Sequence, residues 1–147
     1  MRVRELLNRK PAGVVSISPS ATTAAAARLL MERGVGGLSV VDSEGNLAGF
    51  VSERDIVRLV DRHGKDIRNA PVSEIMRRPA PMCAADDSIR DVMARLTRER
   101  LRHLVVMDGT RVAGVISVGD LVKQRLEQLE TEAGVLRDYV AGQRARK

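Results

Sequence analysis

The chain has 147 residues, of which 44% are hydrophobic and 30% are charged, a balance typical of a globular protein and not of a disordered one. Its length suffices for one ordinary domain or for two closely joined half-domains. Its single cysteine, Cys83, excludes an internal disulfide, and its net charge of +6 comes with only two aromatic residues, which argues against a stacking surface for single-stranded nucleic acid.

Neither the start of the chain nor any later segment predicts insertion into a membrane. No apolar run approaches the roughly 20 residues that a membrane span needs, and the first residues lack the apolar stretch of a signal peptide. We therefore expect a cytoplasmic protein with no membrane and no nucleic-acid partner. Its basic character suits an anionic small molecule or an acidic protein equally.

The first predicted elements form a β-α-β-β-α series. A short strand at 14–17 precedes an alanine-rich helix at 21–33, which Gly34 would end in a left-handed conformation. Two strands joined by a turn follow at 38–41 and 47–51, and the second of them leads directly into another helix. This series predicts an α/β unit.

The same series follows a second time. A strand at 81–84 precedes a helix whose start, Asp86-Asp87-Ser88, supplies acidic residues and a cap. Strands at 104–107 and 111–116 then lead into a final helix. The first of these helices has the apolar spacing of a helix that packs on a sheet, with Ile89, Val92, Met93 and Leu96.

The two series are copies of one another. One set of residues recurs 66 positions later: Leu30, Leu38, Val40 and Asp42. A second set recurs 65 positions later: Ala48, Gly49, Ser52, Asp55 and Val57. Because a unit of about 60 residues buries little core alone, we expect the two units to pack together. The predicted boundaries are 1–65, 66–127 and a helical extension at 128–147.

One motif occurs at the same place in both copies. It reads Gly-apolar-apolar-Ser-x-x-Asp-apolar-apolar, from Gly49 to Val57 and from Gly114 to Val122. Taken singly, Ser-x-x-Asp before an apolar run is typical of a capping box. The same geometry also suits a ligand, because a helix N-terminus presents N–H groups to a phosphate and a carboxylate can accept from ribose hydroxyls. Its presence in two matching contexts favours a ligand site.

The last predicted helix differs from the others. Its apolar positions are spaced four, three, four, three and four residues apart: Val122, Leu126, Leu129, Ala133, Leu136 and Val140. This heptad seam predicts self-association, and the alternative is a helix that packs back on its own domain. Gly134 costs about 1 kcal/mol relative to alanine within a helix and weakens the prediction of an unbroken rod.

With both junctions and both β-α-β-β-α units, residues 1–127 resemble a tandem pair of CBS domains (cystathionine-β-synthase domains). The strand Arg102-His103-Leu104-Val105-Val106 is similar to the Arg-His-Leu-Pro-Val strand of that family, with Val105 in place of the usual proline. The end of the chain, at 136–142, is similar to small stand-alone bacterial members. The resemblance implies two units about a pseudo-two-fold axis, a homodimer, no obligatory cofactor, and clefts that bind AMP, ADP, ATP or a related adenosyl ligand.

The resemblance also assigns roles to residues in two pockets. In the first pocket Asp55 would hold ribose hydroxyls and Ser52 would lie near the phosphate; in the second pocket Asp120 and Ser117 would do the same. Strand residues of each unit would cover the pocket of the other unit. Those expected at the first pocket are Pro81, Met82, Arg102 and His103. Those expected at the second pocket are Val15 and Gly36.

The two pockets differ in predicted charge. Arg102 and His103 are matched by two glycines in the first copy, and Arg54 is matched by Gly119 in the second copy. All three differences place positive charge at the first pocket. We therefore expect the first pocket to bind phosphate more tightly than the second pocket.

Nothing in the sequence predicts catalysis. The two histidines and one cysteine have neither zinc-ligand spacing nor the arrangement of a nucleophile with its base. Cys83 aligns with Ile17 on a predicted strand and is expected to be a small core residue. We therefore predict a non-enzymatic sensor that regulates a partner protein in trans. The alternative is a structural or partner-binding scaffold with vestigial pockets and a dimerising C-terminal helix.

Overall fold

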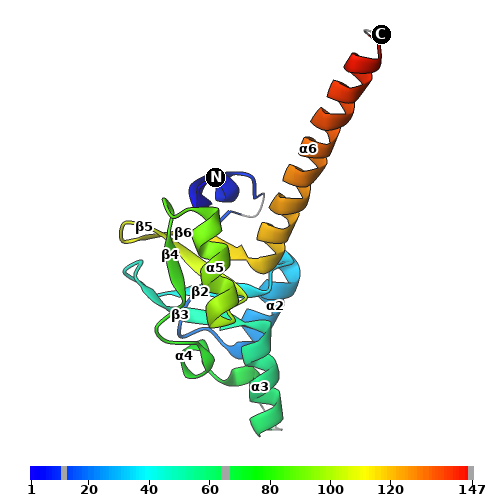
Figure 1. Cartoon of the computed structure of the whole chain (residues 1–147). Coiled ribbons are helices and arrows are strands. Elements are labelled where there is room, and N and C mark those ends of the chain that lie inside the picture. Colours follow the sequence, from blue (N-terminus) through cyan, green and yellow to red (C-terminus); the bar gives the residue numbers. More distant parts are fainter. Residues whose placement is uncertain (11–12, 64–66, 146–147) are drawn as a thin grey trace.

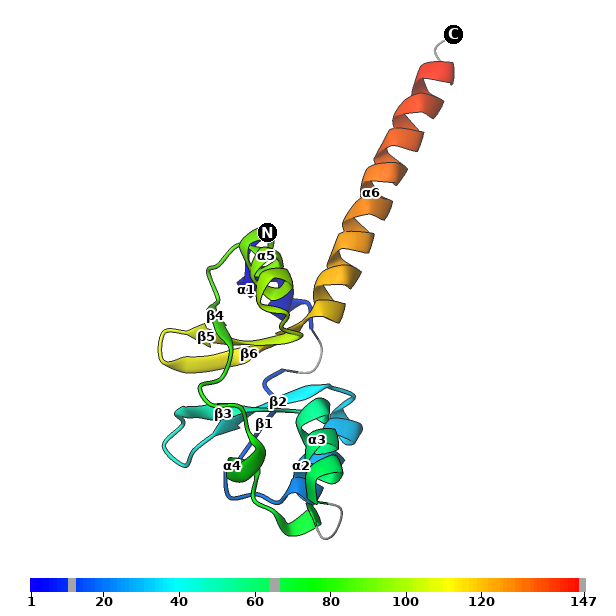
Figure 2. The same cartoon turned by 60° about the horizontal axis from the view of Figure 1, so that its bottom comes forward.

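The computed structural model describes residues 1–10, 13–63 and 67–145. Two small α/β units lie one above the other, and a long C-terminal helix projects away from both (Figures 1 and 2). The elements of the first half are α1 (Val3–Asn8), β1 (Ser16–Ile17), α2 (Thr23–Arg33), β2 (Gly37–Val41), β3 (Leu47–Ser52) and α3 (Glu53–His63). Those of the second half are a 3-10 turn (Ile67–Asn69), α4 (Val72–Ile75), β4 (Met82–Ala84), α5 (Ile89–Glu99), β5 (His103–Asp108), β6 (Arg111–Ser117) and α6 (Val118–Ala145).

Each unit contains one three-stranded sheet of the same topology. The strand orders are β1-β2-β3 and β4-β5-β6, with the first pair of strands parallel and the second pair antiparallel. Both hairpins carry a register shift near their turn, between Val40 and Val41 and between Val106 and Met107. The predicted α/β fold of two repeated β-α-β-β-α units is therefore confirmed, with the opening strands shorter than expected.

Local sequence signals explain where the first helix of each series begins and ends. The side chains of Thr22 and Ser88 accept hydrogen bonds from Ala25 N and Asp91 N at the starts of α2 and α5. Gly34 ends α2 with φ of 62°, as predicted. At the end of α5 a non-glycine residue, Arg100, takes the same left-handed conformation with φ of 55°.

The short opening helices are exchanged between the units. Val3 N donates to the carbonyl of Asp87, so α1 packs on the second unit, where Val3 and Leu6 are buried. Val72 N donates to the carbonyl of Ala21, so α4 packs on the first unit, where Val72 is buried. The halves are thus interlocked. The predicted boundary at 65/66 lies outside the described residues, and α6 crosses the one at 127/128 without interruption.

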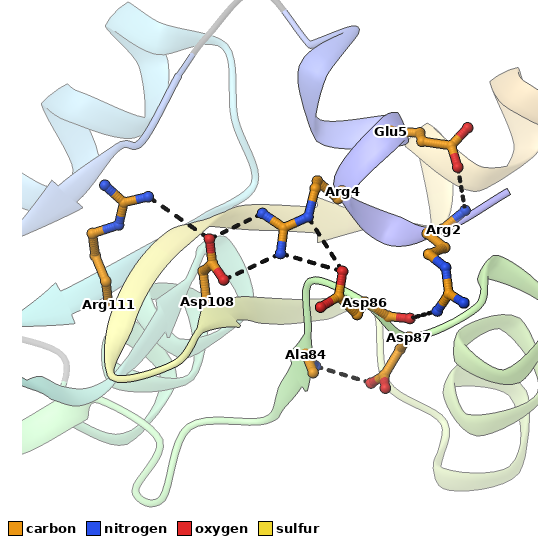
Figure 3. Close-up of polar contacts among 8 residues, drawn as sticks. All are labelled: Arg2, Arg4, Glu5, Ala84, Asp86, Asp87, Asp108 and Arg111. Carbon is orange, nitrogen blue, oxygen red and sulfur yellow. Dashed lines mark hydrogen bonds and ion pairs between the residues drawn. The ribbon is translucent and has the colours of Figure 1, made fainter.

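An arginine on α1 joins three elements at the surface of the second unit (Figure 3). The Arg4 guanidinium donates to both carboxylate oxygens of Asp108, at 3.0 and 3.2 Å, and to Asp86 at 3.3 Å. Arg111 lies 3.8 Å from the same Asp108 carboxylate. These contacts fix α1 against β5 and against the turn before α5.

The two sheets meet through a small apolar core. Phe50 of β3, Ala80 and Val105 of β5 are buried there. The Phe50 ring packs over Gly37 on the neighbouring strand of the same sheet, where a Cβ at Gly37 would lie 2.1 Å from Phe50 Cζ. Contacts between β2 and β6 complete the join between the units. Each junction motif lies beside a hollow between the units.

The C-terminal helix extends beyond both units. The alternative that it packs back on its own domain is wrong for the helix from Leu126 onward, because Leu126 and Leu136 are 55% and 63% exposed. Gly134 does not interrupt the helix. Among the described residues, no helix combines the length and the hydropathy required to cross a bilayer.

Candidate functional site

Both Ser-x-x-Asp motifs form the start of a helix directly after a strand. In the first, Ser52 N and Ser52 Oγ donate to Asp55 Oδ2 at 2.8 and 2.9 Å. In the second, Ser117 N donates to Asp120 Oδ2 at 2.9 Å, and Asp120 N donates to Ser117 Oγ at 3.2 Å. Each aspartate therefore caps its own helix, which is the structural interpretation that the sequence already allowed.

Capping leaves one oxygen of each carboxylate for other partners. Asp55 Oδ1 has a cation, Arg58 Nη1, at 4.0 Å. Among the described residues, no hydrogen bond engages Oδ1 of Asp120. A capping role and a ligand role are thus compatible at each junction, because they use different oxygens.

The second pocket is a hollow of about 300 Å³ between the two units. One wall carries Ser117, Asp120 and Val115 of the second unit. The opposite wall carries Val15 and Gly36 of the first unit, the two residues expected there from the sequence. The hollow therefore combines aliphatic surface with a serine and a carboxylate at a helix N-terminus, a composition that suits a small organic ligand.

Lys10 also reaches into the second pocket, and sequence reasoning missed it. Its Nζ donates to Asp120 Oδ2 at 2.8 Å and to the Val115 carbonyl at 2.7 Å. Burial by itself raises the pKa of Asp120, but the hydrogen bonds from Lys10 and from Ser117 outweigh burial and hold that pKa below its ordinary value. No local signal could have found this contact, since Lys10 precedes Asp120 by 110 residues.

The first pocket is smaller and more cationic. Its volume is about 90 Å³, and Ser52, Asp55, Pro81 and Arg102 line it as expected. Its other cationic lining side chains are Arg54, Arg77 and Arg100. Arg77 and Arg100 were not predicted, although Arg100 precedes Arg102 by only two positions. Met82 lines neither pocket; it is 42% exposed on the edge strand β4.

His103 lies between the two pockets and borders both. Its ring is 5.4 Å from the ring of Phe50, and its Nε2 would lie 3.1 Å from a Cβ at Gly36. Burial lowers the pKa of His103, and the positive charge of Lys10 lowers it further. His103 therefore stays uncharged at neutral pH and does not add the positive charge that the sequence suggested for the first pocket.

A larger hollow lies elsewhere on the described chain. It measures about 840 Å³ and occupies the open angle between α5 and the projecting α6. None of the four junction residues lines it. Because only the two smaller pockets contain the junction residues, they remain the candidate sites.

Comparison with known proteins agrees with this geometry. The sequence model of the family described as CBS domain matches residues 3–62 and 72–127. The CBS-domain containing protein ATU1752 from Agrobacterium tumefaciens superimposes with a TM-score of 0.79 at 34% identity, over 84% of this chain and 92% of that one. The CBS domain-containing protein YhcV of Bacillus subtilis is 29% identical over 113 residues, which are 77% of this chain and 79% of that protein.

One structural neighbour was solved with ligands. The CBS domain pair of protein MJ0100, in complex with 5′-methylthioadenosine and S-adenosyl-L-methionine, superimposes with a TM-score of 0.77 at 21% identity, over 87% of this chain and 98% of that one. The two matched segments, the repeated topology and the structural neighbours lead to one assignment. This chain belongs to the CBS domain family and is a CBS pair, a regulatory ligand-binding module, followed by a long C-terminal helix.

Proposed function

We propose that this CBS pair is a non-enzymatic sensor that binds an adenosyl ligand, such as AMP, ADP or ATP, between its units and regulates a partner protein in trans. The observation that carries the proposal is the position of Ser117 and Asp120 beside a hollow of about 300 Å³ with a wall from the other unit. That volume is at the lower limit of ordinary small-molecule sites.

In the second pocket, each part of an adenosine has a matching group. A ribose hydroxyl donates to Asp120 Oδ1, the oxygen that the cap leaves unused. The base lies against Val15, Val35 and Val115, which line the same hollow. With no Phe, Tyr or Trp among the described residues that line this pocket, adenine takes its hydrogen bonds from strand backbone and its contacts mainly from aliphatic surface.

The first pocket suits the phosphate-bearing ligand better. Four arginines line it: Arg54, Arg77, Arg100 and Arg102. Arginine binds phosphate through paired N–H donors, and the N-terminus of α3 adds a favourable dipole. Since the hollow is only about 90 Å³ and all four arginines are exposed, their side chains move apart to admit the ligand. We propose that AMP binds more tightly here than in the second pocket.

The mechanism is a shift between two packings of the units. Both pockets lie where the units meet, and His103, in contact with Phe50 of the other unit, borders both. A ligand that binds one packing more tightly than the other shifts the population by that difference in affinity. The ligands in the MJ0100 complex share the adenosyl group, which supports this ligand class for the fold.

Calorimetry with matched variants tests the proposal. Adenosine, AMP, ADP, ATP and S-adenosylmethionine are titrated into the wild type, Asp55→Asn, Asp120→Asn and, as a control on the exposed face of α3, Asp61→Asn. We expect Asp55→Asn to weaken AMP binding more than Asp120→Asn does, and Asp61→Asn to leave it unchanged. Arg102→Gln lowers affinity for AMP but not for adenosine, because it removes a phosphate contact.

Thermal unfolding gives an independent measurement. A ligand at 100 times its dissociation constant stabilises the folded state by about 2.7 kcal/mol. If no adenosyl compound raises the melting temperature at millimolar concentration, the sensor function is wrong, and the partner-binding scaffold remains.

A further inference from the structure

From Val122 onward, α6 presents an apolar seam that no described part of the chain covers. The seam consists of Val122, Leu126, Leu129, Ala133, Leu136 and Val140, and all six are exposed. The helix contacts α5 and β6 near its start and then projects away from the body, as both views show (Figures 1 and 2). A continuous apolar stripe in water is unfavourable and indicates a missing partner.

We propose that this seam pairs in parallel with the same helix of a second copy of the chain, as a two-stranded coiled coil. In heptad notation the a positions are Leu126, Ala133 and Val140, and the d positions are Val122, Leu129 and Leu136. Gly134 falls at a b position, on the outer face, so it leaves no gap in the seam. This proposal goes beyond the ligand site and does not depend on it.

The charges that flank the seam select the parallel orientation. In a parallel pair, each g residue faces the e residue five positions later on the other helix. Arg125 then faces Glu130 of the second copy, and Glu132 faces Arg137 of the second copy. By symmetry each contact occurs twice, so the parallel arrangement gains four attractive pairs.

The antiparallel arrangement with full overlap of the seams is disfavoured by the same charges. In an antiparallel pair, the e residues of one helix face the e residues of the other, and the g residues face the g residues. Glu130 would face its own counterpart, Glu132 would face its own counterpart, and Lys123 would face Arg137. Like charges that face each other across an interface are unfavourable. A second copy is therefore the occupant that the sequence of α6 itself specifies, and parallel is its orientation.

A parallel pair has a consequence for the body of the protein. The same continuous helix begins at Val118, and its first turn carries Asp120 of the second pocket. The coil therefore places the second units of the two copies side by side and connects their second pockets through rigid helices. Any change of packing at that junction would be transmitted along α6.

Disulfide crosslinking tests the pairing and its direction. Gln143 occupies the next d position, so in a parallel coil the thiols of Gln143→Cys meet, whereas in the antiparallel coil they lie about 36 Å apart. We expect most of the Gln143→Cys chain to form a disulfide-linked dimer under mild oxidation at micromolar concentration. Asp138→Cys, at an outward f position, is the matched control and should not crosslink.

The native thiol does not interfere with this measurement. Cys83 is buried, and burial together with the charge of Asp87 raises its pKa to about 11. The absence of a Gln143→Cys crosslink, or equal crosslinking at positions 143 and 138, would overturn the proposal.

A charge swap gives a second test. Sedimentation measures the dissociation constant of the dimer, and we expect Glu132→Arg to raise it about tenfold, since two attractive pairs become repulsive. The double variant Glu132→Arg/Arg137→Glu restores opposite charges and should bind within about threefold of the wild type. If the double variant is as weak as the single one, the parallel pairing is wrong.

Discussion

Lys10 Nζ lies 2.8 Å from Asp120 Oδ2, so a residue near the start of the chain holds the carboxylate at the start of its last helix. The contact joins the segment after α1 to the first turn of α6, and both side chains are mostly buried. It orients Asp120 in the second pocket while leaving the other carboxylate oxygen without a hydrogen bond among the described residues.

Replacing Lys10 by methionine keeps the apolar stem and removes the charge. We expect the free energy of unfolding at pH 7 to fall by about 1 to 2 kcal/mol, because a half-buried carboxylate loses a charged hydrogen-bond donor. Since the pKa of Asp120 is lowered in the folded state, the contribution is present above its ordinary value of 3.8 and is lost as the pH falls through the folded pKa. Urea denaturation measures the difference in unfolding free energy between the wild type and Lys10→Met at each pH. If that difference is the same at pH 7 and pH 2, the contact between Lys10 and Asp120 is not its origin.

The pKa of His103 predicts a second pH dependence. Burial, and then Lys10, lower this pKa below 6.5, so the folded protein binds the proton less readily than the unfolded chain. Stability is therefore highest above pH 6.5 and decreases as the pH falls through the folded pKa. NMR titration of the imidazole should give a midpoint below 6.5, and AMP should raise it, because a nearby phosphate favours the charged ring. A midpoint above 6.5 without ligand would show that the ring is not desolvated.

The contact between Arg4 and Asp108 predicts how the pKa of Asp108 responds to substitution. The hydrogen bond and charge of Arg4 lower the pKa of this exposed carboxylate. In Arg4→Gln the pKa should return towards 3.8, and in Arg111→Gln, whose guanidinium is 3.8 Å away, the change should be smaller. The stabilisation by Arg4 is lost as the pH falls through the lowered pKa and also weakens with salt. Carbon-detected NMR of the carboxyl group measures both variants, and equal shifts in the two would refute the leading role of Arg4.

Two glycines predict opposite effects of alanine. At Gly37 the new Cβ would lie 2.1 Å from Phe50 Cζ, so the ring is forced out of the core between the sheets and stability falls by about 1 to 3 kcal/mol. At Gly134 a new Cβ meets nothing within 4 Å inside α6, so helix stability rises by up to about 1 kcal/mol. Urea denaturation measures the loss of stability in Gly37→Ala. Far-UV circular dichroism measures the gain of helix stability in Gly134→Ala. A neutral Gly37→Ala would mean that the Phe50 ring does not pack this closely on Gly37.

The sequence by itself determined the repeated unit and the local structure at its key points. Gly34 as a helix end, Ser88 as a cap and the two Ser-x-x-Asp helix starts all depend on atoms a few residues apart. Such interactions are encoded locally, and their recurrence in two copies made the pattern unambiguous. The expected places of Val15, Gly36, Pro81 and Arg102 followed from the family resemblance and the pseudo-symmetry.

Only the tertiary structure decided which groups share a pocket. The exchange of α1 and α4 brings Lys10 to Asp120, and the close packing of the sheets puts His103 beside both hollows instead of one. It also adds Arg77 and Arg100 to the first pocket and leaves Met82 outside. These outcomes depend on contacts between residues far apart in the chain, whose geometry is set by how two preformed units fit together. Nothing in the local sequence around Lys10 or His103 specifies that fit.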